Sequence, residues 1–226
     1  MKIYVTRHGQ VELNAQYFNG DVSLPKGEVP LSELGRQQAV LLGKRMRELG
    51  FRGKIFSSPF FRTMETAELI ARETKAVIVP TPWIHEKFVS QPDLELYRGF
   101  NTEELRCLFS HIAKDVDMEE IWWPSRVEDV NSVRERVTLG LGKCLSESEG
   151  DILLVGHGAS VGAVYSYLHL RKNSIIWNCS LGLYDTEHPE NNYGNNIEHL
   201  PRHMVSNNKL MGMDIDFDDT WIKPNY

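Results

Sequence analysis

An unbroken apolar run, Ile152-Leu153-Leu154-Val155, is the feature that most limits the fold of this chain. A strand made of four consecutive apolar residues has no polar face, so it must be covered on both sides, as the central strands of parallel sheets are. The run ends at Gly156-His157-Gly158, after which Val161, Val164 and Leu168 recur at helical spacing. The order of strand, tight turn and helix predicts one unit of an α/β fold.

The same alternation recurs along the chain. Short β-prone runs predict further strands at residues 3–5, 54–56, 77–79 and 181–184. Helical spacing predicts helices at residues 31–49, 59–73 and 130–145. Ser32 is expected to cap the first helix and Gly50 to close it, and Ser58 is expected to cap the second, with Pro59 at its first position. Together these elements predict a three-layer αβα sandwich with a mostly parallel, doubly wound sheet.

The remaining segments are expected to decorate one domain that spans residues 1–226. With 226 residues and 41% hydrophobic content, the chain can bury a substantial core. Residues 83–124 are aromatic, irregular and partly helical, which predicts a helical cap insertion over one edge of the sheet. The chain after Glu187 is rich in Asn, His and Pro and is expected to add little core, and residues 202–226 are expected to form a poorly packed acidic tail.

Charge and cysteine content limit the partners and the compartment. A formal charge of −6 argues against a general affinity for nucleic acid or an anionic membrane, so binding of an anionic ligand must be local. The three cysteines, Cys107, Cys144 and Cys179, are far apart in the sequence and predict reduced thiols that pack in the structure. Neither a signal peptide nor a membrane-spanning segment is predicted, and a cytoplasmic location is expected.

Basic and imidazole side chains follow several of the predicted strands. Arg7-His8 follows the first strand, Arg62 lies one turn into the helix after the second, and His157 follows the central strand. Ligands of open parallel sheets bind beyond the carboxyl ends of the strands, so these four side chains are expected to converge. They suit a phosphate monoester, because a neutral imidazole can attack phosphorus while fixed arginines hold the equatorial oxygens. Gly9 and Gly158 would let the backbone approach the phosphate.

Several ordered motifs resemble those of the histidine phosphatase superfamily, the phosphoglycerate-mutase-like fold. The motifs are Thr6-Arg7-His8-Gly9 with Asn14, residues 30–39, Ser57-Ser58-Pro59-Phe60-Phe61-Arg62-Thr63 with Thr66-Ala67, and Val155-Gly156-His157-Gly158. Each motif alone is weak and the series is specific. The resemblance extends over roughly residues 1–185.

The resemblance implies a role for each matching residue. It implies that His8 is the nucleophile, that Arg7, Arg62 and His157 form the phosphate pocket, and that Glu86 gives a proton to the leaving oxygen. It also suggests that Asn14, Asn19, Gly20 and Gly158 bind substrate, although the first three could equally be turn formers. The expected substrate is a small phosphorylated metabolite, with no metal and no cofactor required. The oligomeric state is not predicted.

Departures from the family pattern favour a phosphatase over a mutase. Gln10 stands where a glutamate is common, Asn19-Gly20 is one residue off the mutase spacing, and no glycine-rich continuation follows Glu86. A mutase must retain a bisphosphorylated intermediate in a closed, cationic site, whereas a phosphatase needs only to admit water. The alternatives are therefore a phosphoglycerate mutase and, from another class, a non-catalytic phosphate-binding domain.

The substrate's alcohol portion is left open by the sequence. In the predicted cap, Lys87, Arg98 and Arg106 could bind a second acidic group. The aromatic residues Phe88, Tyr97 and Phe100 could instead contact a larger organic portion.

Other patterns favour ordinary structural roles. Gly156, Gly158 and Gly162 resemble a dinucleotide-binding loop, but no acidic residue lies about twenty positions further on to hold a ribose. Pro201 separates His199 from His203 and argues against a helical metal pair, so solvated loop histidines are expected. Asp214, Asp216 and Asp218 resemble the start of a calcium loop whose required glycine and closing glutamate are missing. Trp122-Trp123 are expected to pack in the cap.

Overall fold

A computed structural model describes residues 1–12, 24–25, 27–170 and 175–207 of the chain. In chain order its elements are β1 (Lys2–Arg7), α1 (Glu33–Glu48), β2 (Lys54–Ser57), α2 (Phe61–Thr74), β3 (Ile78–Pro80), η2 (Pro82–Ile84), α3 (Gln91–Leu96), α4 (Thr102–Leu108), α5 (Val130–Glu147), β4 (Ile152–Gly156), α6 (Gly158–Tyr167), β5 (Leu181–Asp185), η3 (Pro189–Asn191), β6 (Tyr193–Asn196) and η4 (Arg202–Met204). None of the helices within these residues has the length and apolar content needed to span a bilayer.

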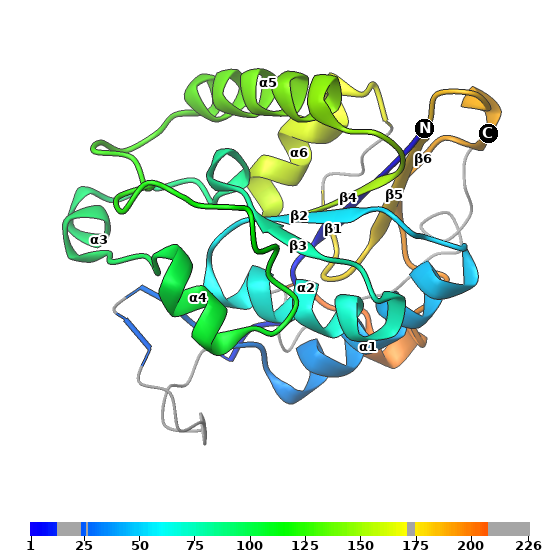
Figure 1. The fold of residues 1–226 in the computed structure, drawn as a ribbon, viewed down its shortest axis with the longest axis horizontal. Helices are drawn as coiled ribbons and strands as arrows, with labels where there is room; N and C mark the ends of the chain where they lie inside the picture. Colours follow the sequence, from blue (N-terminus) through cyan, green and yellow to red (C-terminus); the bar gives the residue numbers. More distant parts are fainter. Residues whose placement is uncertain (13–23, 26, 171–174, 208–226) are drawn as a thin grey trace.

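The strands form one mixed sheet between two layers of helices (Figure 1). Within the described residues the strand order is β3-β2-β4-β1-β5-β6. Helices α1 and α2 cover one face of the sheet, and α5 and α6 cover the other. The predicted three-layer αβα sandwich is therefore confirmed. The pairs β1–β4, β2–β4 and β2–β3 are parallel, whereas β5 pairs antiparallel with both β1 and β6.

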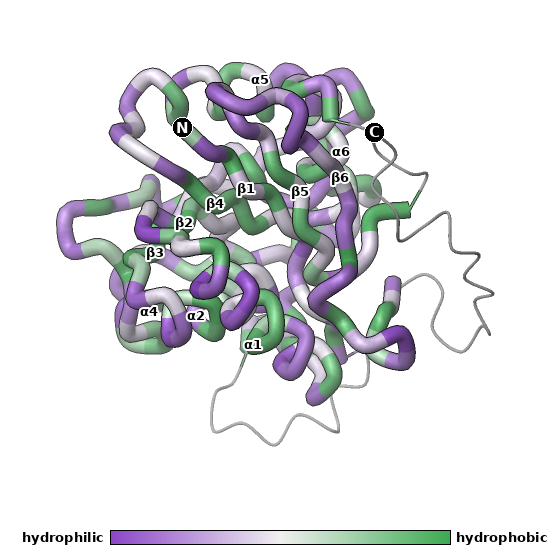
Figure 2. Tube along the Cα trace, turned by 90° about the vertical axis from the view of Figure 1, so that its right-hand side faces the viewer, coloured by the Kyte–Doolittle hydropathy of each residue, from purple (hydrophilic) through white to green (hydrophobic). Residues whose placement is uncertain are grey.

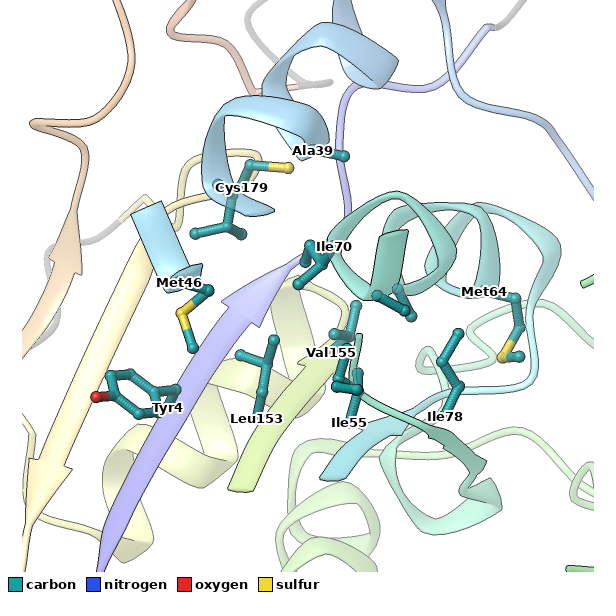
Figure 3. Close-up of a cluster of buried hydrophobic side chains, with 14 of the residues drawn as sticks. Tyr4, Ala39, Met46, Ile55, Met64, Ile70, Ile78, Leu153, Val155 and Cys179 are labelled. Atoms are coloured by element: carbon teal, nitrogen blue, oxygen red, sulfur yellow. The ribbon is translucent and has the colours of Figure 1, made fainter. Parts of the chain in front are cut away.

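The central strands are buried on both faces, as the apolar run predicted. All five residues of β4 are buried, and Figure 2 shows the apolar strands in the middle of the molecule. On the side of α1 and α2, Leu153 and Val155 pack with Met46 and Ile70 (Figure 3). On the opposite side, Leu154 packs in a second cluster with residues of α5 and α6. Burial of each such side chain contributes about 1.5–3 kcal/mol, so this strand is a major source of stability.

The register of the central strands brings their carboxyl ends to one edge of the sheet. Arg7 lies opposite Gly156, and Ser57 lies opposite Val155. The backbone N–H of His8 donates to the carbonyl of Gly156 at 3.0 Å, and that of Ser58 donates to Val155 at 3.0 Å. The residues that follow β1, β2 and β4 therefore leave the sheet next to one another.

Residues 83–124 divide between the main core and a separate aromatic cluster. Leu105 and Phe109 pack in the core beside α2, and Ile112 forms a bridge with Ile78 at the edge of the sheet. Around the carboxyl end of β2, by contrast, aromatic side chains contact one another in what we call the cap aromatic cluster. Its members are Phe60, Phe88, Tyr97 and Trp122. Packing of Trp122 in the cap was expected from the sequence.

The chain after Glu187 adds more core than the sequence suggested. It forms the edge strand β6, and Ile197, Leu200 and Met204 are buried. The prediction of little core there is wrong, because isolated apolar residues between polar ones carry no periodic signal. Within the predicted tail, Met204 and Asn207 are buried, whereas Arg202 and His203 are exposed. The acidic residues 214–219 lie outside the described part of the chain.

Helix starts show where local signals work and where they do not. Ser32 caps α1 as predicted, and its hydroxyl accepts from the N–H of Gly35 at 3.1 Å. The prediction that Ser58 caps α2 is wrong, because α2 begins at Phe61 and the N–H of Phe61 donates to Glu28 at 2.8 Å. Arg62 is consequently the second residue of α2 and does not lie one turn into the helix, as the sequence had predicted.

The cysteines are all free, but they do not share one environment. Cys144 and Cys179 are buried, whereas Cys107 is exposed. The expectation that all three simply pack is therefore wrong for Cys107. Its position on α4 leaves the thiol facing outward, because the apolar side of that short helix is provided by Leu105.

Candidate active site

His8 lies in a short turn that fixes the orientation of its ring. The residue follows β1 directly and is 2% exposed. Its Nδ1 lies 2.7 Å from the carbonyl oxygen of Gly9, so this nitrogen carries the proton and donates, which leaves a lone pair on Nε2. Gly9 is required here because a Cβ would lie 2.5 Å from the carbonyl oxygen of Gly35. The glycine thus allows close contact with α1, a reason different from the phosphate contact expected from the sequence.

Two buried guanidinium groups lie beside this imidazole. Arg7 is held through Nη1, which donates to the carbonyl of Ile176 at 2.8 Å, while its buried Nε has no partner within the described residues. The guanidinium carbon of Arg62 lies 4.4 Å from the ring centroid of Phe60. In the described part of the chain neither arginine lies within ion-pair distance of a carboxylate, although Glu86 interacts electrostatically with Arg7 and Glu28 with Arg62. Two buried positive groups therefore lie at one place, an arrangement that suits the binding of an anion.

His157 completes the group from the other parallel strand. The centroids of its ring and of the His8 ring are 5.3 Å apart. Its Nε2 lies 2.9 Å from the hydroxyl of Ser58, whereas its buried Nδ1 has no hydrogen-bond partner within the described residues. An oxyanion would select the tautomer in which Nδ1 carries the proton and Ser58 donates to Nε2. Ser58, the expected helix cap, thus orients the second histidine.

Glu86 lies on the same side of His157 as the unpaired ring nitrogen. One of its carboxylate oxygens is 3.8 Å from Nδ1, and the side chain is 32% exposed. The backbone around it is held by Arg136, which donates to the carbonyls of Trp83 and His85 and pairs with Glu128 at 2.8 Å. The backbone just before Glu86 is therefore held by a partly buried ion pair.

Burial and the two arginines keep both site histidines neutral. Burial lowers the pKa of His8 well below its ordinary value, and the charges of Arg7 and Arg62 lower it further. The pKa of His157 is lowered in the same direction, first by burial and then by Arg62. Burial also lowers the pKa of Arg7, against the opposing effect of Glu86. The lone pair of His8 is thus available at neutral pH, which nucleophilic attack requires.

Folding stability should fall steeply on mild acidification. Burial is the first cause of a lowered pKa at His8, His157, His85 (to about 3) and His199 (to about 4). Below the unfolded pKa of about 6.5, the unfolded chain binds protons that the folded chain excludes, which costs about 1.4 kcal/mol per pH unit and histidine. Burial raises the pKa of Glu28, and this carboxyl therefore acts in the opposite direction. Urea unfolding should therefore give up to about 5 kcal/mol less stability at pH 5.5 than at pH 7.5.

The variant His199→Gln tests whether the neutral histidines cause this loss of folding stability. His199 contacts the carbonyl of Cys179 at 2.9 Å through Nε2, a contact that a glutamine amide can replace. His199→Gln should lose about 1.4 kcal/mol less stability than the parent between the two pH values. Equal stability of the parent protein at pH 5.5 and pH 7.5 would contradict the proposed neutrality of these rings.

The other residues predicted from the sequence have varied outcomes. Gly158 begins α6, next to His157, and an added Cβ there would meet no atom within 4 Å. Asn14, Asn19 and Gly20 lie outside the described residues. His199 is half-buried and His203 is exposed, so the expectation of solvated histidines holds only for His203. No cluster of three or more potential metal ligands occurs in the part of the chain that the structure describes.

Several residues that support the site were not predicted as site residues from the sequence. The N–H of Gly9 donates to the hydroxyl of Thr66 at 3.1 Å, and that hydroxyl donates to the carbonyl of Arg62 at 2.7 Å. Asn178 donates to the carbonyl of His8 at 2.8 Å. Ser58 and Thr66 belong to a recognisable motif, so their importance could have been inferred. Asn178 could not, because only the tertiary structure brings it to the turn.

Comparisons with known proteins agree with this arrangement. A family model described as the histidine phosphatase superfamily (branch 1) matches residues 3–189. The probable phosphoglycerate mutase GpmB of Proteus mirabilis is 28% identical over 192 residues, which cover 82% of this chain and 85% of that protein. GpmB of an Enterobacter species is 29% identical over 203 residues, with the same two shares covered.

Solved structures share the fold. The ecdysone phosphate phosphatase of Bombix mori, solved with tungstate, superposes with a TM-score of 0.61 at 17% identity and covers 82% of this chain and 89% of its own. Bacillus stearothermophilus YhfR superposes with a TM-score of 0.58 at 22% identity and covers 90% of this chain and 98% of its own. With a family match over most of its length and this shared fold, the chain belongs to branch 1 of the histidine phosphatase superfamily.

Proposed function

We propose that this protein is a phosphomonoester hydrolase in which Nε2 of His8 takes the phosphoryl group. The proposal rests on one observation: a ring nitrogen of His8 with a free lone pair lies beside buried N–H groups that have no hydrogen-bond partner within the described residues. Nδ1 of His8 is committed to Gly9, while the buried Arg7 Nε and His157 Nδ1 have no partner within the described residues. Arg62 adds a second positive charge. Such donors stabilise negative charge on the equatorial oxygens of the transferring group.

In the first step, Nε2 of His8 attacks phosphorus and the bond from phosphorus to the ester oxygen breaks. Glu86, as a carboxylic acid, gives its proton to the departing oxygen and becomes a carboxylate. Its position 3.8 Å from His157 Nδ1 supports this role, because His157 would contact the same phosphoryl group. The product alcohol then leaves a phosphohistidine in the cradle of Arg7 and Arg62.

In the second step, water attacks the phosphohistidine. The Glu86 carboxylate accepts a proton from that water, the bond from Nε2 to phosphorus breaks, and inorganic phosphate forms. Glu86 is again protonated and His8 again neutral, so the cycle is balanced. Partial exposure of Glu86 supports this step, since it gives water a route to the reacting atoms.

A phosphoglycerate mutase is the second candidate, because relatives at 28% and 29% identity carry that name. A mutase returns the phosphoryl group to another hydroxyl of the substrate and must hold a second acidic group meanwhile. Supplying 3-phosphoglycerate labelled in its phosphoryl group separates the two activities. We expect the label in inorganic phosphate, and label mainly in 2-phosphoglycerate would overturn the hydrolase proposal.

Glu86→Gln tests the proton donor. An alkyl phosphate needs protonation of its leaving oxygen, so its kcat should fall by about 10²- to 10⁴-fold. Nitrophenyl phosphate, whose leaving group is stable as an anion, should lose much less in the phosphorylation step. Single-turnover rates with both substrates measure the difference. Glu198→Gln, at an exposed position, is the matched control. Equal losses for the two substrates would argue that Glu86 does not protonate the leaving oxygen.

A further inference from the structure

A cavity of about 290 Å³ adjoins the proposed proton donor. Glu86 lies in its wall, as do Phe60, Phe88 and Tyr97 of the cap aromatic cluster. The centroid of the Phe60 ring is also 5.1 Å from that of His157, and the Arg62 guanidinium stacks on the same ring. Phe60 therefore separates the phosphate cradle from the cavity. A group attached to an ester oxygen beside Glu86 can extend into this space.

The aromatic wall of the cavity presents rings and no free hydroxyl. The Phe60 and Tyr97 rings are stacked, with centroids 4.9 Å apart. Tyr97 could have offered a polar contact, but its hydroxyl donates to the buried carboxylate of Glu28 at 2.6 Å. The other oxygen of Glu28 accepts from the N–H of Phe61 at 2.8 Å. The hydroxyl of Tyr97 is thus bonded to the carboxylate that also binds the first residue of α2. Only the ring of Tyr97 is left to contact a ligand. Leu96, 51% exposed, extends the apolar surface toward the opening.

The two arginines of the cap bind groups that do not line the cavity. Arg98 pairs with Glu104 at 2.5 Å. Arg106 pairs with Glu103 at 2.6 Å and donates to the carbonyl of Val116 at 2.6 Å. Within the described residues, neither arginine lines the cavity, and Phe100, also considered from the sequence, packs against Phe61 in the main core.

The charged lining of the cavity, apart from Glu86, is balanced. Lys87 and Asp93 both line it and carry opposite charges. A second acidic group on the substrate would therefore meet an acidic side chain as well as a basic one. An apolar group would meet rings and a leucine side chain, which it can contact without leaving a polar group unpaired.

We infer that the cavity binds the alcohol portion of the substrate, and that preferred substrates are phosphomonoesters of alcohols with an apolar, aryl-sized group near the ester oxygen. The inference rests on the proposed hydrolase function, since it assigns the leaving group of that reaction. It applies to the same site and adds the class of molecule that the site selects. It predicts poor use of small, doubly anionic substrates such as phosphoglycerate.

The test compares substrates with similar leaving groups and different apolar size. 3-Phenylpropyl phosphate and n-propyl phosphate are both esters of primary alcohols, so the chemistry of departure is closely matched. We expect kcat/KM to be higher for the phenylpropyl ester by at least about tenfold, as is typical when a hydrophobic pocket gains an apolar group. 3-Phosphoglycerate should be hydrolysed no faster than the propyl ester.

Leu96→Gln assigns the preference to this cavity. The variant keeps the size of a half-exposed side chain and adds a polar amide, so it should reduce the ratio of the two kcat/KM values by about threefold or more. The rate with n-propyl phosphate should change little. Leu139→Gln is the matched control, because Leu139 is 68% exposed on α5 and does not line the cavity. It should leave the ratio unchanged.

The possible outcomes separate this inference from the hydrolase proposal. Hydrolysis of both esters at equal kcat/KM, or a preference for 3-phosphoglycerate, would overturn the apolar subsite while leaving the hydrolase proposal intact. A tenfold preference that Leu96→Gln does not alter would also overturn it, since the preference would then arise elsewhere. Absence of phosphate release from every ester, including nitrophenyl phosphate, would contradict the hydrolase proposal itself.

Discussion

His8→Ala is expected to reduce phosphomonoester hydrolysis by at least about 10⁴-fold, as loss of a covalent nucleophile does in other hydrolases. The reason is specific to the arrangement: Nε2 of His8 is the free nitrogen of a ring whose other nitrogen is held by Gly9. Rapid quench with labelled substrate should also detect an acid-labile, alkali-stable phosphoenzyme in the parent protein and none in the variant. Steady-state release of phosphate gives the magnitude.

Two controls test whether a loss of activity in His8→Ala comes from misfolding or from an unspecific effect of removing a histidine. The variant should still bind inorganic phosphate, because Arg7 and Arg62 do not depend on the imidazole for their charge. Retained phosphate binding would show that the site is folded. His188→Ala, which removes an exposed histidine in contact with Glu190, should retain full activity. Equal rates for His8→Ala and the parent protein would leave the non-catalytic phosphate-binding alternative in place.

Arg62→Lys should have the next largest effect, a fall in kcat/KM of about 10²- to 10³-fold. Lysine keeps the charge but loses the planar fork that can bind two phosphate oxygens. It also loses the stacking of the guanidinium on Phe60, which fixes the group at 4.4 Å from the ring centroid. The inhibition constant of inorganic phosphate should rise as well, although by a smaller factor than kcat/KM falls. The planar guanidinium matches the oxygens of the transition state more closely than those of bound phosphate, so its loss weakens binding of the transition state more.

The same helix supplies a control for this substitution. Arg72 lies ten positions further along α2, where it is 62% exposed and pairs with Glu68 at 3.3 Å. Arg72→Lys should change kcat/KM by less than about twofold, as exposed ion pairs contribute little. Comparable losses in the two variants would show that the effect comes from α2 as a whole and not from a phosphate contact.

The parts of the fold that follow from periodic burial could be predicted from the sequence. The run at residues 152–155 indicated a strand buried on both faces, and the rule for parallel sheets then placed His157 beside His8. Ser58 shows the limit of local signals. A serine followed by proline predicts a helix start, yet the N–H of Phe61 is satisfied by Glu28, which lies 33 residues earlier in the chain. The hydroxyl of Ser58 was thereby left to bind His157.

Polar contacts set by tertiary structure were missed for the same reason. Asn178 has no periodic or motif context, and its contact with the His8 carbonyl exists only because β5 pairs with β1. Met204 belongs to a pair of apolar residues, Met204-Val205, between polar ones, and it is buried and accepts through its carbonyl from Gln38. The pairing of Arg106 with Glu103, at helical spacing, was within reach of the sequence, and it would have removed one candidate cation from the cap.

The anchoring of the first turn by the last described residues has a consequence for synthesis of the protein. Strand β1 lies between β4 and β5, and Asn178, which supports His8, is itself bonded to Ser206 through its backbone N–H at 2.9 Å. His8 is thus ordered through contacts with residues that are translated much later than the turn itself. A chain terminated shortly before residue 200 would carry every phosphate-binding side chain named above and still lack the contacts that align them. We therefore expect the nascent protein to remain inactive until the segment that contains Ser206 has been synthesised and has docked.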